Sequence, residues 1–320
     1  MTEATPLRIG YLPTFYHTSH LLRADGWAPD GRPPTWTLEM TGPALVRSLG
    51  AGALDLAYIG LPPAMIAIAR GVPIRCIAGG HEEGTIVVAG QDVPLTRTDG
   101  TGLRATLRAL EGGTVGIPAA GSIHDVIFRE LVREHGLERS IAIRNFVQAD
   151  LITEALAAGE LRAGVGTPAL GAAAHRYAGA TVVVPARALW PHNPSYGIVA
   201  TDAARSRTDL VREFLRAHEA ATALIRHDPA EAARRTAASV EVSDAALIEE
   251  SYRISPRYCG ALSAGFVTAT HRFGAALLRL GYLPRAVAPD EVFDDGPLRD
   301  VHPEAPHYDE PIAGTAPGHR

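Results

Sequence analysis

The sequence contains no lysine, and all 30 basic residues of the 320-residue chain are arginine. A chain without lysine cannot form the Schiff base of ordinary pyridoxal-phosphate enzymes, so lysine-linked pyridoxal phosphate is excluded as a cofactor. The same absence excludes a phosphate-binding loop that depends on a lysine. The net charge of −5 provides no broad basic field, so nucleic acid is not an expected partner.

Cysteine and long apolar runs are also scarce. The two cysteines, Cys76 and Cys259, cannot build a disulfide framework, and Cys76 lies in an apolar strand where a buried hydrophobic role is expected. No stretch approaches the roughly 18 consecutive apolar residues of a membrane span. The first residues lack the basic and apolar regions of a signal peptide. We therefore expect a cytoplasmic protein as given, or an extracytoplasmic one if a leader was removed.

The most informative stretch covers residues 54–84. It predicts a strand at 54–59, a short helix that begins at Pro62 and ends at Gly71, and a second strand at 74–78. Strand, helix and strand in about thirty residues make a βαβ unit, in which ligands bind beyond the carboxyl ends of the strands. Gly60, Leu61 and the polar loop 79–84 lie at that edge, which predicts a small-molecule site.

The same alternation of predicted strands and helices continues through the rest of the chain. Strands and helices alternate through the first ninety residues and again from 114 to 185, which predicts two similar α/β lobes. An amphipathic helix at 209–227 and further helices predict a covering layer on the first lobe. Beyond residue 290 the chain is rich in proline, glycine and acidic residues, which favours an extended or disordered tail.

Three segments carry a family resemblance: RIGYLPTFYHTS, GPALVRSLGAGALDLAYIGLPPAMIAIARGVPIRCIAG and LEGGTVGIPAAGSIHDVIFRELVREHGL. In order and spacing they resemble the nitrate/sulfonate/taurine class of substrate-binding proteins of ABC transporters. The same fold serves pyrimidine-precursor synthases and aromatic sulfinate desulfinases. The resemblance covers residues 8–228.

The resemblance implies an α/β, two-lobed, type II periplasmic-binding-protein fold. Such a fold has mixed sheets flanked by helices and two crossover strands, expected here near 85–93 and 191–201. The first lobe would be discontinuous, with residues 1–90 and 197–290, the second lobe would hold residues 91–196, and residues 291–320 would form an extended C-terminal tail. A ligand would bind between the lobes.

The chain departs from the enzymes of this fold. The desulfinases carry a nucleophilic cysteine in the loop after the first strand, where this chain reads PTFYHTSH. The pyrimidine synthases carry a lysine for pyridoxal phosphate and a cysteine-rich iron motif, and this chain has neither. The residues that carry both enzymatic activities are therefore missing from this chain. The transport proteins of the class carry an export signal, and this sequence does not show one either.

Five loops would face the cleft. Helix-end amides, hydroxyl groups and rings in these loops could hold a small polar or anionic molecule. The expected ligand-binding residues are Thr14, Tyr16, His17, Thr18, Gly60, Leu61, His81, Ser122, His124, Thr167, Asn193 and Tyr196. His81 could bind a carboxylate or sulfonate when protonated, or accept a proton when neutral. The adjacent Glu82 and Glu83 would repel an anion unless they face away or pair.

The leading hypothesis is a solute-binding protein that closes its lobes on a sulfonate, carboxylate or heteroaromatic ligand, as for ABC import. An ABC permease is the possible partner, and the protein is expected to be a monomer or dimer. The alternative is a cytoplasmic enzyme that uses His81, Glu82 and His124 in acid–base or metal-dependent chemistry. A third reading is a cytoplasmic sensor. No cofactor or metal is expected, with iron or zinc at His17 and His81 as the weak alternative.

Overall fold

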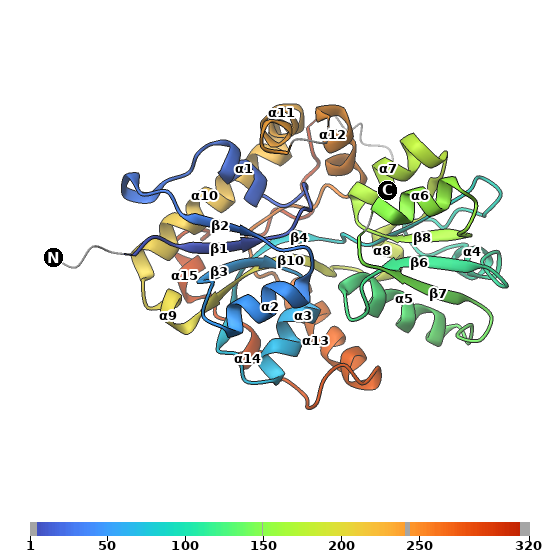
Figure 1. Cartoon of the computed structure of the whole chain (residues 1–320), viewed down its shortest axis with the longest axis horizontal. Coiled ribbons are helices and arrows are strands. Elements are labelled where there is room, and N and C mark those ends of the chain that lie inside the picture. The colour runs from blue at the N-terminus through green and yellow to red at the C-terminus, as the bar shows by residue number, and fades with distance from the viewer. Residues whose placement is uncertain (1–4, 149, 241–243, 314–320) are drawn as a thin grey trace.

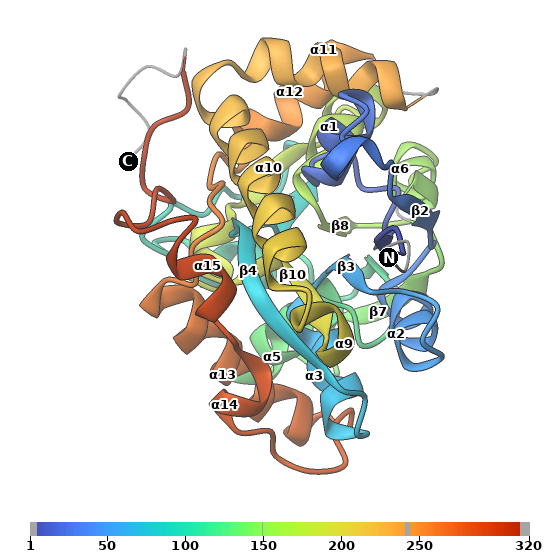
Figure 2. The same cartoon turned by 90° about the vertical axis from the view of Figure 1, so that its left-hand side faces the viewer.

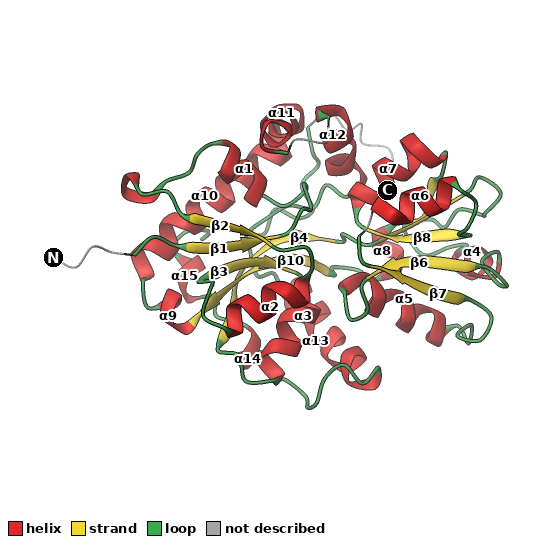
Figure 3. Ribbon diagram, viewed as in Figure 1, coloured by secondary structure: helices red, strands yellow, loops and turns green. Residues whose placement is uncertain are grey.

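The computed structural model describes residues 5–148, 150–240 and 244–313. Two five-stranded mixed sheets lie side by side, each flanked by helices on both faces (Figure 1). This is the predicted α/β fold class. Figure 3 shows that helices account for most of the covering layers. No described helix has both the length and the apolar character needed to cross a membrane.

The first sheet has the strand order β2-β1-β3-β10-β4. Strands β1, β2 and β3 are parallel, and β10 runs antiparallel to both β3 and β4. The bounds are β1 (Arg8–Tyr11), β2 (Thr35–Leu38), β3 (Leu56–Ile59), β4 (Ile74–Glu82) and β10 (Pro194–Thr201).

Helices cover both faces of this sheet (Figure 1). One face carries α1 (Ser19–Ala24), α10 (Thr208–His227) and α11 (Pro229–Ser239), with α12 (Ala245–Ile254) beyond them. The other face carries α2 (Gly42–Gly50), α3 (Leu61–Ala69), α13 (Ala264–Arg279) and α14 (Pro289–Val292). The remaining short helices are η1 (Pro29–Gly31), α9 (Asp202–Arg205) and α15 (Gly296–Arg299).

Helix α10 illustrates how the sequence builds this lobe. Its buried side chains recur every three or four residues, as a helix with one core-facing side requires. They are Val211, Phe214, Leu215, His218, Ala221, Thr222, Ile225 and Arg226. Asp209 in its first turn and Arg226 and His227 in its last turn also match the helix dipole.

The second sheet has the order β7-β6-β8-β5-β9. Its strands are β5 (Ile86–Ala89), β6 (Thr114–Pro118), β7 (Ala142–Phe146), β8 (Ala163–Gly166) and β9 (Thr181–Val184). Its helices are α4 (Leu103–Arg108), α5 (Ile123–Glu134), α6 (Asp150–Ala157), α7 (Pro168–Ala178) and α8 (Ala186–Leu189). Helix α5 begins as predicted, because the Ser122 hydroxyl accepts a hydrogen bond from the Asp125 amide at 3.3 Å.

The chain crosses between the sheets earlier than the sequence suggested. The first crossing is at 83–85, between β4 and β5, and the second is at 185–193, between β9 and β10. Strand β5, which we expected in the first lobe, pairs with β8 and β9, and Ser195 and Tyr196 belong to the first sheet. All four residues of β5 are buried, and a fully buried strand carries no pattern that shows which sheet it joins.

The expectation of an extended C-terminal tail was wrong for its described part. Residues 291–313 pack along the first lobe beside α10 and β4 (Figure 2). Tyr308 is 3% exposed and Ile312 is 1% exposed. The Tyr308 hydroxyl fits against Gly79, where an added Cβ would lie 2.1 Å from it. The composition of this segment is that of a tail, but its buried Tyr308 and Ile312 side chains pack against the first lobe.

Candidate functional site

A group of buried rings lies where the loop after β1 meets β3, the end of β4 and the start of β10. We call it the aromatic cluster, and its members are at most 3% exposed. The ring centroids of His17 and Tyr196 are 4.1 Å apart, and those of Tyr16 and His81 are 5.1 Å apart. The members are Tyr16, His17, Tyr58, His81, Tyr196 and Tyr258.

Strand register brings these rings together. Tyr196 on β10 lies opposite His81 on β4, and His81 in turn forms a backbone bridge with Tyr258. Gly80 makes the arrangement possible, because a Cβ at that position would lie 2.1 Å from the Tyr196 ring. The sequence named Tyr16, His17, His81 and Tyr196 separately, and the structure places them in one cluster.

Hydroxyl groups connect the cluster to its surroundings. The Tyr16 and Ser195 hydroxyls are 2.7 Å apart. The Thr18 hydroxyl lies 2.8 Å from Nδ1 of His218, whose Nε2 lies 2.9 Å from the carbonyl oxygen of Gly79. Nε2 can only donate to a carbonyl, so Nδ1 of His218 accepts from Thr18.

Sequence reasoning did not single out Tyr58, Ser195, His218 or Tyr258. His218 carried a usable signal, because it occupies the buried stripe of α10 that is otherwise mainly apolar. Tyr58 lies in β3, an apolar strand whose sequence indicates only a role in the hydrophobic core. Its role depends on which face of the sheet meets the loop after β1, and only the tertiary structure shows this.

Several polar atoms of the cluster have no hydrogen-bond partner among the described residues. Nε2 of His81 donates to the Ser255 carbonyl oxygen at 2.7 Å, which leaves its Nδ1 as an unpartnered acceptor. Nδ1 of His17 and the Tyr258 hydroxyl are also unpartnered. Each such buried group costs about 1–3 kcal/mol, so these atoms mark positions that a ligand or water would complete.

The cluster is neutral at physiological pH. Burial lowers the pKa of His81 to about 3. Burial, followed by the neighbouring His20, His81 and His218, holds the pKa of His17 well below its usual value. Burial raises the pKa of the Tyr16 and Tyr196 hydroxyls, which stay protonated. The imidazoles therefore act as hydrogen-bonding groups and not as cations.

The two carboxylates beside His81 are paired away from the cluster. Oε2 of Glu82 lies 3.1 Å from Nδ1 of His192 and 3.4 Å from Nη2 of Arg257. Oε2 of Glu83 lies 3.3 Å from Nε of Arg257. Burial raises the pKa of Glu82, while His192 and Arg257 act against that rise. His81 and Glu82 thus contact different neighbours, and the predicted acid–base pair is not assembled.

The start of α5 in the second lobe meets the first lobe close to the cluster. A Cβ on Gly60 would lie 3.5 Å from the Ser195 carbonyl oxygen and 4.0 Å from Cβ of Ile123. The N-terminus of α5 is not a free anion-binding site, because Oδ2 of Asp125 already accepts a hydrogen bond from the Gly121 amide at 3.0 Å. Next to Ile123, His124 has its Nδ1 2.9 Å from the Thr85 hydroxyl, and burial lowers its pKa to about 4.

The other predicted residues have mainly structural contacts. Leu61 is fully buried in the apolar core. The Thr167 hydroxyl accepts from the Leu170 amide at 3.3 Å and caps α7, as Ser122 caps α5. Nδ2 of Asn193 donates to the Trp190 carbonyl oxygen within the second crossing, and the Thr14 carbonyl oxygen accepts from the His17 amide.

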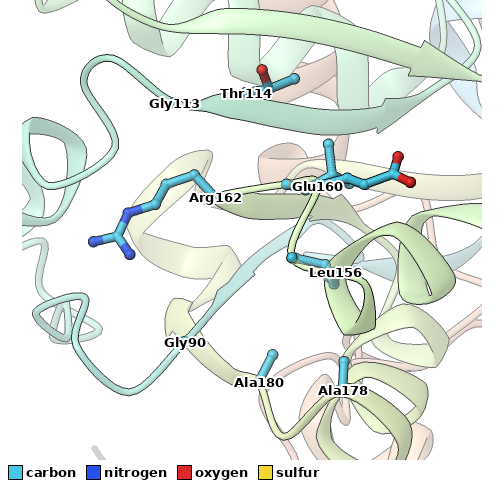
Figure 4. A pocket seen from close by; sticks show the side chains of 10 residues that line it. Gly90, Gly113, Thr114, Leu156, Glu160, Arg162, Ala178 and Ala180 are labelled. Carbon is cyan, nitrogen blue, oxygen red and sulfur yellow. The ribbon is translucent and has the colours of Figure 1, made fainter.

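Two surface pockets lie away from the cluster. A pocket of about 410 Å³ opens at the far end of the second lobe (Figure 4). Its Arg162 is already bound to Asp92 at 2.6 Å. A pocket of about 470 Å³ lies beside Trp27 and Trp36 in the first lobe. Neither pocket contains any of the predicted site residues.

Two α/β lobes joined by two crossings define the fold of the periplasmic substrate-binding proteins of ABC importers, as the resemblance implied. The chain belongs to the NMT1-like family, whose model matches residues 1–241. Both findings confirm the predicted resemblance and fold class. A comparison with curated protein sequences gave no match.

Solved structures of the same fold cover nearly the whole chain. The periplasmic aliphatic sulphonate-binding protein SsuA of Escherichia coli is 16% identical, with a TM-score of 0.76 over 91% of this chain and 92% of that one. SsuA of Xanthomonas axonopodis pv. citri, bound to MOPS, is 19% identical, with a TM-score of 0.73 over 92% and 99%. The nitrate-binding protein NrtA of Synechocystis PCC 6803 is 14% identical, with a TM-score of 0.72 over 93% and 88%.

Proposed function

We propose that this protein is a solute-binding protein that holds a small organic molecule against the aromatic cluster, between its two lobes. The observation that carries the proposal is the set of unpartnered polar atoms within a buried ring cluster, which contacts Ser195 next to the second crossing. The similar solved structures, which are those of sulfonate-binding and nitrate-binding proteins, support a ligand-binding role for the fold.

The chemistry of the cluster favours a neutral, planar heteroaromatic ligand over a sulfonate or carboxylate. Rings stack on rings, and neutral imidazoles offer both donors and acceptors. The surrounding charges are also unfavourable for an anion, because Asp125 occupies the start of α5 and Arg257 is already paired with Glu82 and Glu83. Among the residues that the structure describes around the cluster, no free cation would therefore meet an anion that enters the site.

Ligand entry requires the lobes to move apart, because the cluster is almost fully buried. The two crossings are the natural hinges. Each contains a non-glycine residue with positive φ, Glu83 at 58° and His192 at 58°. In this proposal the two residues, which also share the ion-pair network of Arg257, set the angle between the lobes.

The proposal extends to the location, the transport partner and the oligomeric state of the protein. It would work outside the cytoplasm, deliver its ligand to an ABC permease and act as a monomer or dimer. The support is that two of the similar structures, SsuA of Escherichia coli and NrtA, are those of periplasmic proteins. Cell fractionation tests the location, and co-purification with a permease encoded nearby tests the partner.

Native mass spectrometry of the purified full chain, followed by calorimetry, tests the function. Candidate ligands are neutral heteroaromatic compounds, alkanesulfonates and nitrate. We expect heteroaromatic binding that weakens at least about 5-fold in His17→Leu, since one buried hydrogen bond is worth about 1 kcal/mol or more. His227→Gln, on an exposed histidine in the last turn of α10, is the matched control. Equal affinity in both variants would contradict the site assignment.

A further inference from the structure

Four potential metal ligands meet on the side of the first lobe that faces the C-terminal segment. Glu219 comes from α10, Cys259 follows α12, and His302 and His307 follow α15. One ligand atom from each residue lies within 4.8 Å of the others. Cys259 is 0% exposed and His302 is 7% exposed. These residues are separate from the aromatic cluster, although His218 and Tyr258 precede two of them in the chain.

We propose that Glu219, Cys259, His302 and His307 bind one structural zinc-like transition-metal ion. Thiolate, imidazole and carboxylate together are ligands that zinc accepts in four-coordinate sites. With all four positions supplied by protein, the ion has no open position for a substrate. Its role is therefore to hold the structure together.

The distances fit a tetrahedral ion. Zn–S bonds of about 2.3 Å and Zn–N bonds of about 2.0–2.1 Å place sulfur and nitrogen about 3.5 Å apart and two nitrogens about 3.3 Å apart. Sγ of Cys259 lies 3.2 Å from Nε2 of His302 and 3.8 Å from Nδ1 of His307. The two imidazole nitrogens are 3.3 Å apart, and Oε1 of Glu219 lies 3.8 Å from Nδ1 of His307.

Backbone amides around the site would stabilise a bound thiolate and orient the carboxylate. The amides of Ala261 and His307 both donate to Sγ of Cys259, at 3.4 Å and 3.3 Å. The Gly260 amide donates to Oε2 of Glu219 at 2.7 Å, which leaves Oε1 turned toward the histidines. Such outer contacts hold metal ligands in place. One thiolate and one carboxylate also balance the charge of a dication.

Arg226 competes with the ion for two of the ligand atoms. Its guanidinium donates to Nδ1 of His307 at 3.2 Å and to Oε1 of Glu219 at 3.3 Å. A metal ion would take the lone pair of His307. Arg226 would keep its bonds to the Tyr258 carbonyl oxygen at 2.8 Å and to the Thr222 hydroxyl at 3.1 Å. It would therefore remain bound in place, beside the ion.

The site also explains how an irregular segment is held. Beyond α15, residues 300–313 contain no described helix or strand, yet they lie along α10. A metal ion would tie His302 and His307 to α10 and to the loop after α12, which closes long stretches of chain at one point. Tyr308 reinforces this, as its hydroxyl donates to the carbonyl oxygens of Cys259 and Ala261.

Metal analysis of the purified full chain tests the proposal. We expect about one zinc per chain, and at least about 10-fold less in Cys259→Ser and in His302→Gln, because each change removes a ligand. Cys76→Ser and His175→Gln are the controls, since they alter the other cysteine and an exposed histidine. Metal that persists in both ligand variants, or that falls equally in the controls, would overturn the site.

A second measurement needs no variant. The metal is removed with a chelator and replaced by cobalt, whose spectrum shows a thiolate-to-metal charge-transfer band only when sulfur is bound. We expect this band, together with a lower melting temperature of the metal-free chain. A cobalt complex without the band, or a chain that takes up no cobalt, would refute the proposal even if the variants do not fold.

Discussion

The hydroxyl groups of Tyr16 and Ser195 lie 2.7 Å apart, although 179 residues separate them in the sequence. Tyr16 belongs to the loop after β1, and Ser195 is the second residue of β10, close to the second crossing between the lobes. The contact therefore joins the proposed ligand site to one of its hinges. A ligand that contacts Tyr16 would act on the position of the crossing through this hydrogen bond.

Tyr16→Phe should lower the free energy of unfolding by about 1 kcal/mol, because it removes this bond and leaves the Ser195 hydroxyl without its partner. Urea unfolding followed by circular dichroism measures the change. Tyr177→Phe, on a side chain that is 61% exposed, is the control and should have no measurable effect. A similar loss in both variants would show that the Tyr16–Ser195 contact contributes nothing specific.

Gly80→Ala should destabilise the protein by about 1–3 kcal/mol, as overpacking does. The new methyl group would lie 2.1–2.7 Å from atoms of the Tyr196 ring, and a fully buried ring that packs against His17 and Tyr58 has little room to move. Gly50→Ala in α2 is the matched control, because its methyl group would meet Val72 at an ordinary 3.6 Å. Equal unfolding midpoints for the two variants would contradict the packing of Tyr196 on Gly80.

Stability should fall as the pH drops from about 6.5 toward about 4. The pKa of His81 is lowered to about 3 and that of His124 to about 4, so the folded state takes up fewer protons than the unfolded state in this window. The contribution of each histidine is complete above about pH 6.5 and is lost as the pH falls, by up to about 1.4 kcal/mol per pH unit.

Urea unfolding at a series of pH values measures this slope. His124→Gln should flatten it, because the variant no longer carries one buried neutral imidazole. His227→Gln, on an exposed side chain at the end of α10, should leave the slope as it is. An identical slope in wild type and His124→Gln would show that His124 is not held neutral by burial.

Tyr282→Phe should favour an open arrangement of the lobes. Tyr282 lies just after α13, and its hydroxyl donates a hydrogen bond to Oδ2 of Asp125 on α5 at 2.7 Å. Helix α13 itself contacts α3 in the first lobe and α5 in the second. Loss of this bond should increase the radius of gyration measured by X-ray scattering and speed ligand release about 5-fold, the equivalent of about 1 kcal/mol. Unchanged scattering and release would mean that other α13 contacts hold the lobes.

Much of the local structure could be predicted from the sequence. The alternation of strands and helices, the Ser122 cap of α5 and the buried stripe of α10 all appear where the pattern placed them. These features depend on residues within a few positions of one another, so periodicity and capping chemistry are enough to identify them.

The two crossings, the packed C-terminal segment and the partners of the site residues could not be predicted in this way. Strand β5 is uniformly buried, so its sheet is decided by pairing with β8 and β9. The sequence indicated that Glu82 and Glu83 would repel an anionic ligand. Only the structure shows that both carboxylates form ion pairs with Arg257.

The sequence by itself determined the chemistry that is available: an arginine-only chain with histidines, hydroxyls and aromatic rings at the ends of strands. The tertiary structure decided which of these groups meet, and in what charge state. Burial turns the imidazoles of the aromatic cluster neutral, and packing brings Cys259 to Glu219, His302 and His307. Contacts of this kind depend on strand register and side-chain packing between distant segments, which no short-range pattern encodes.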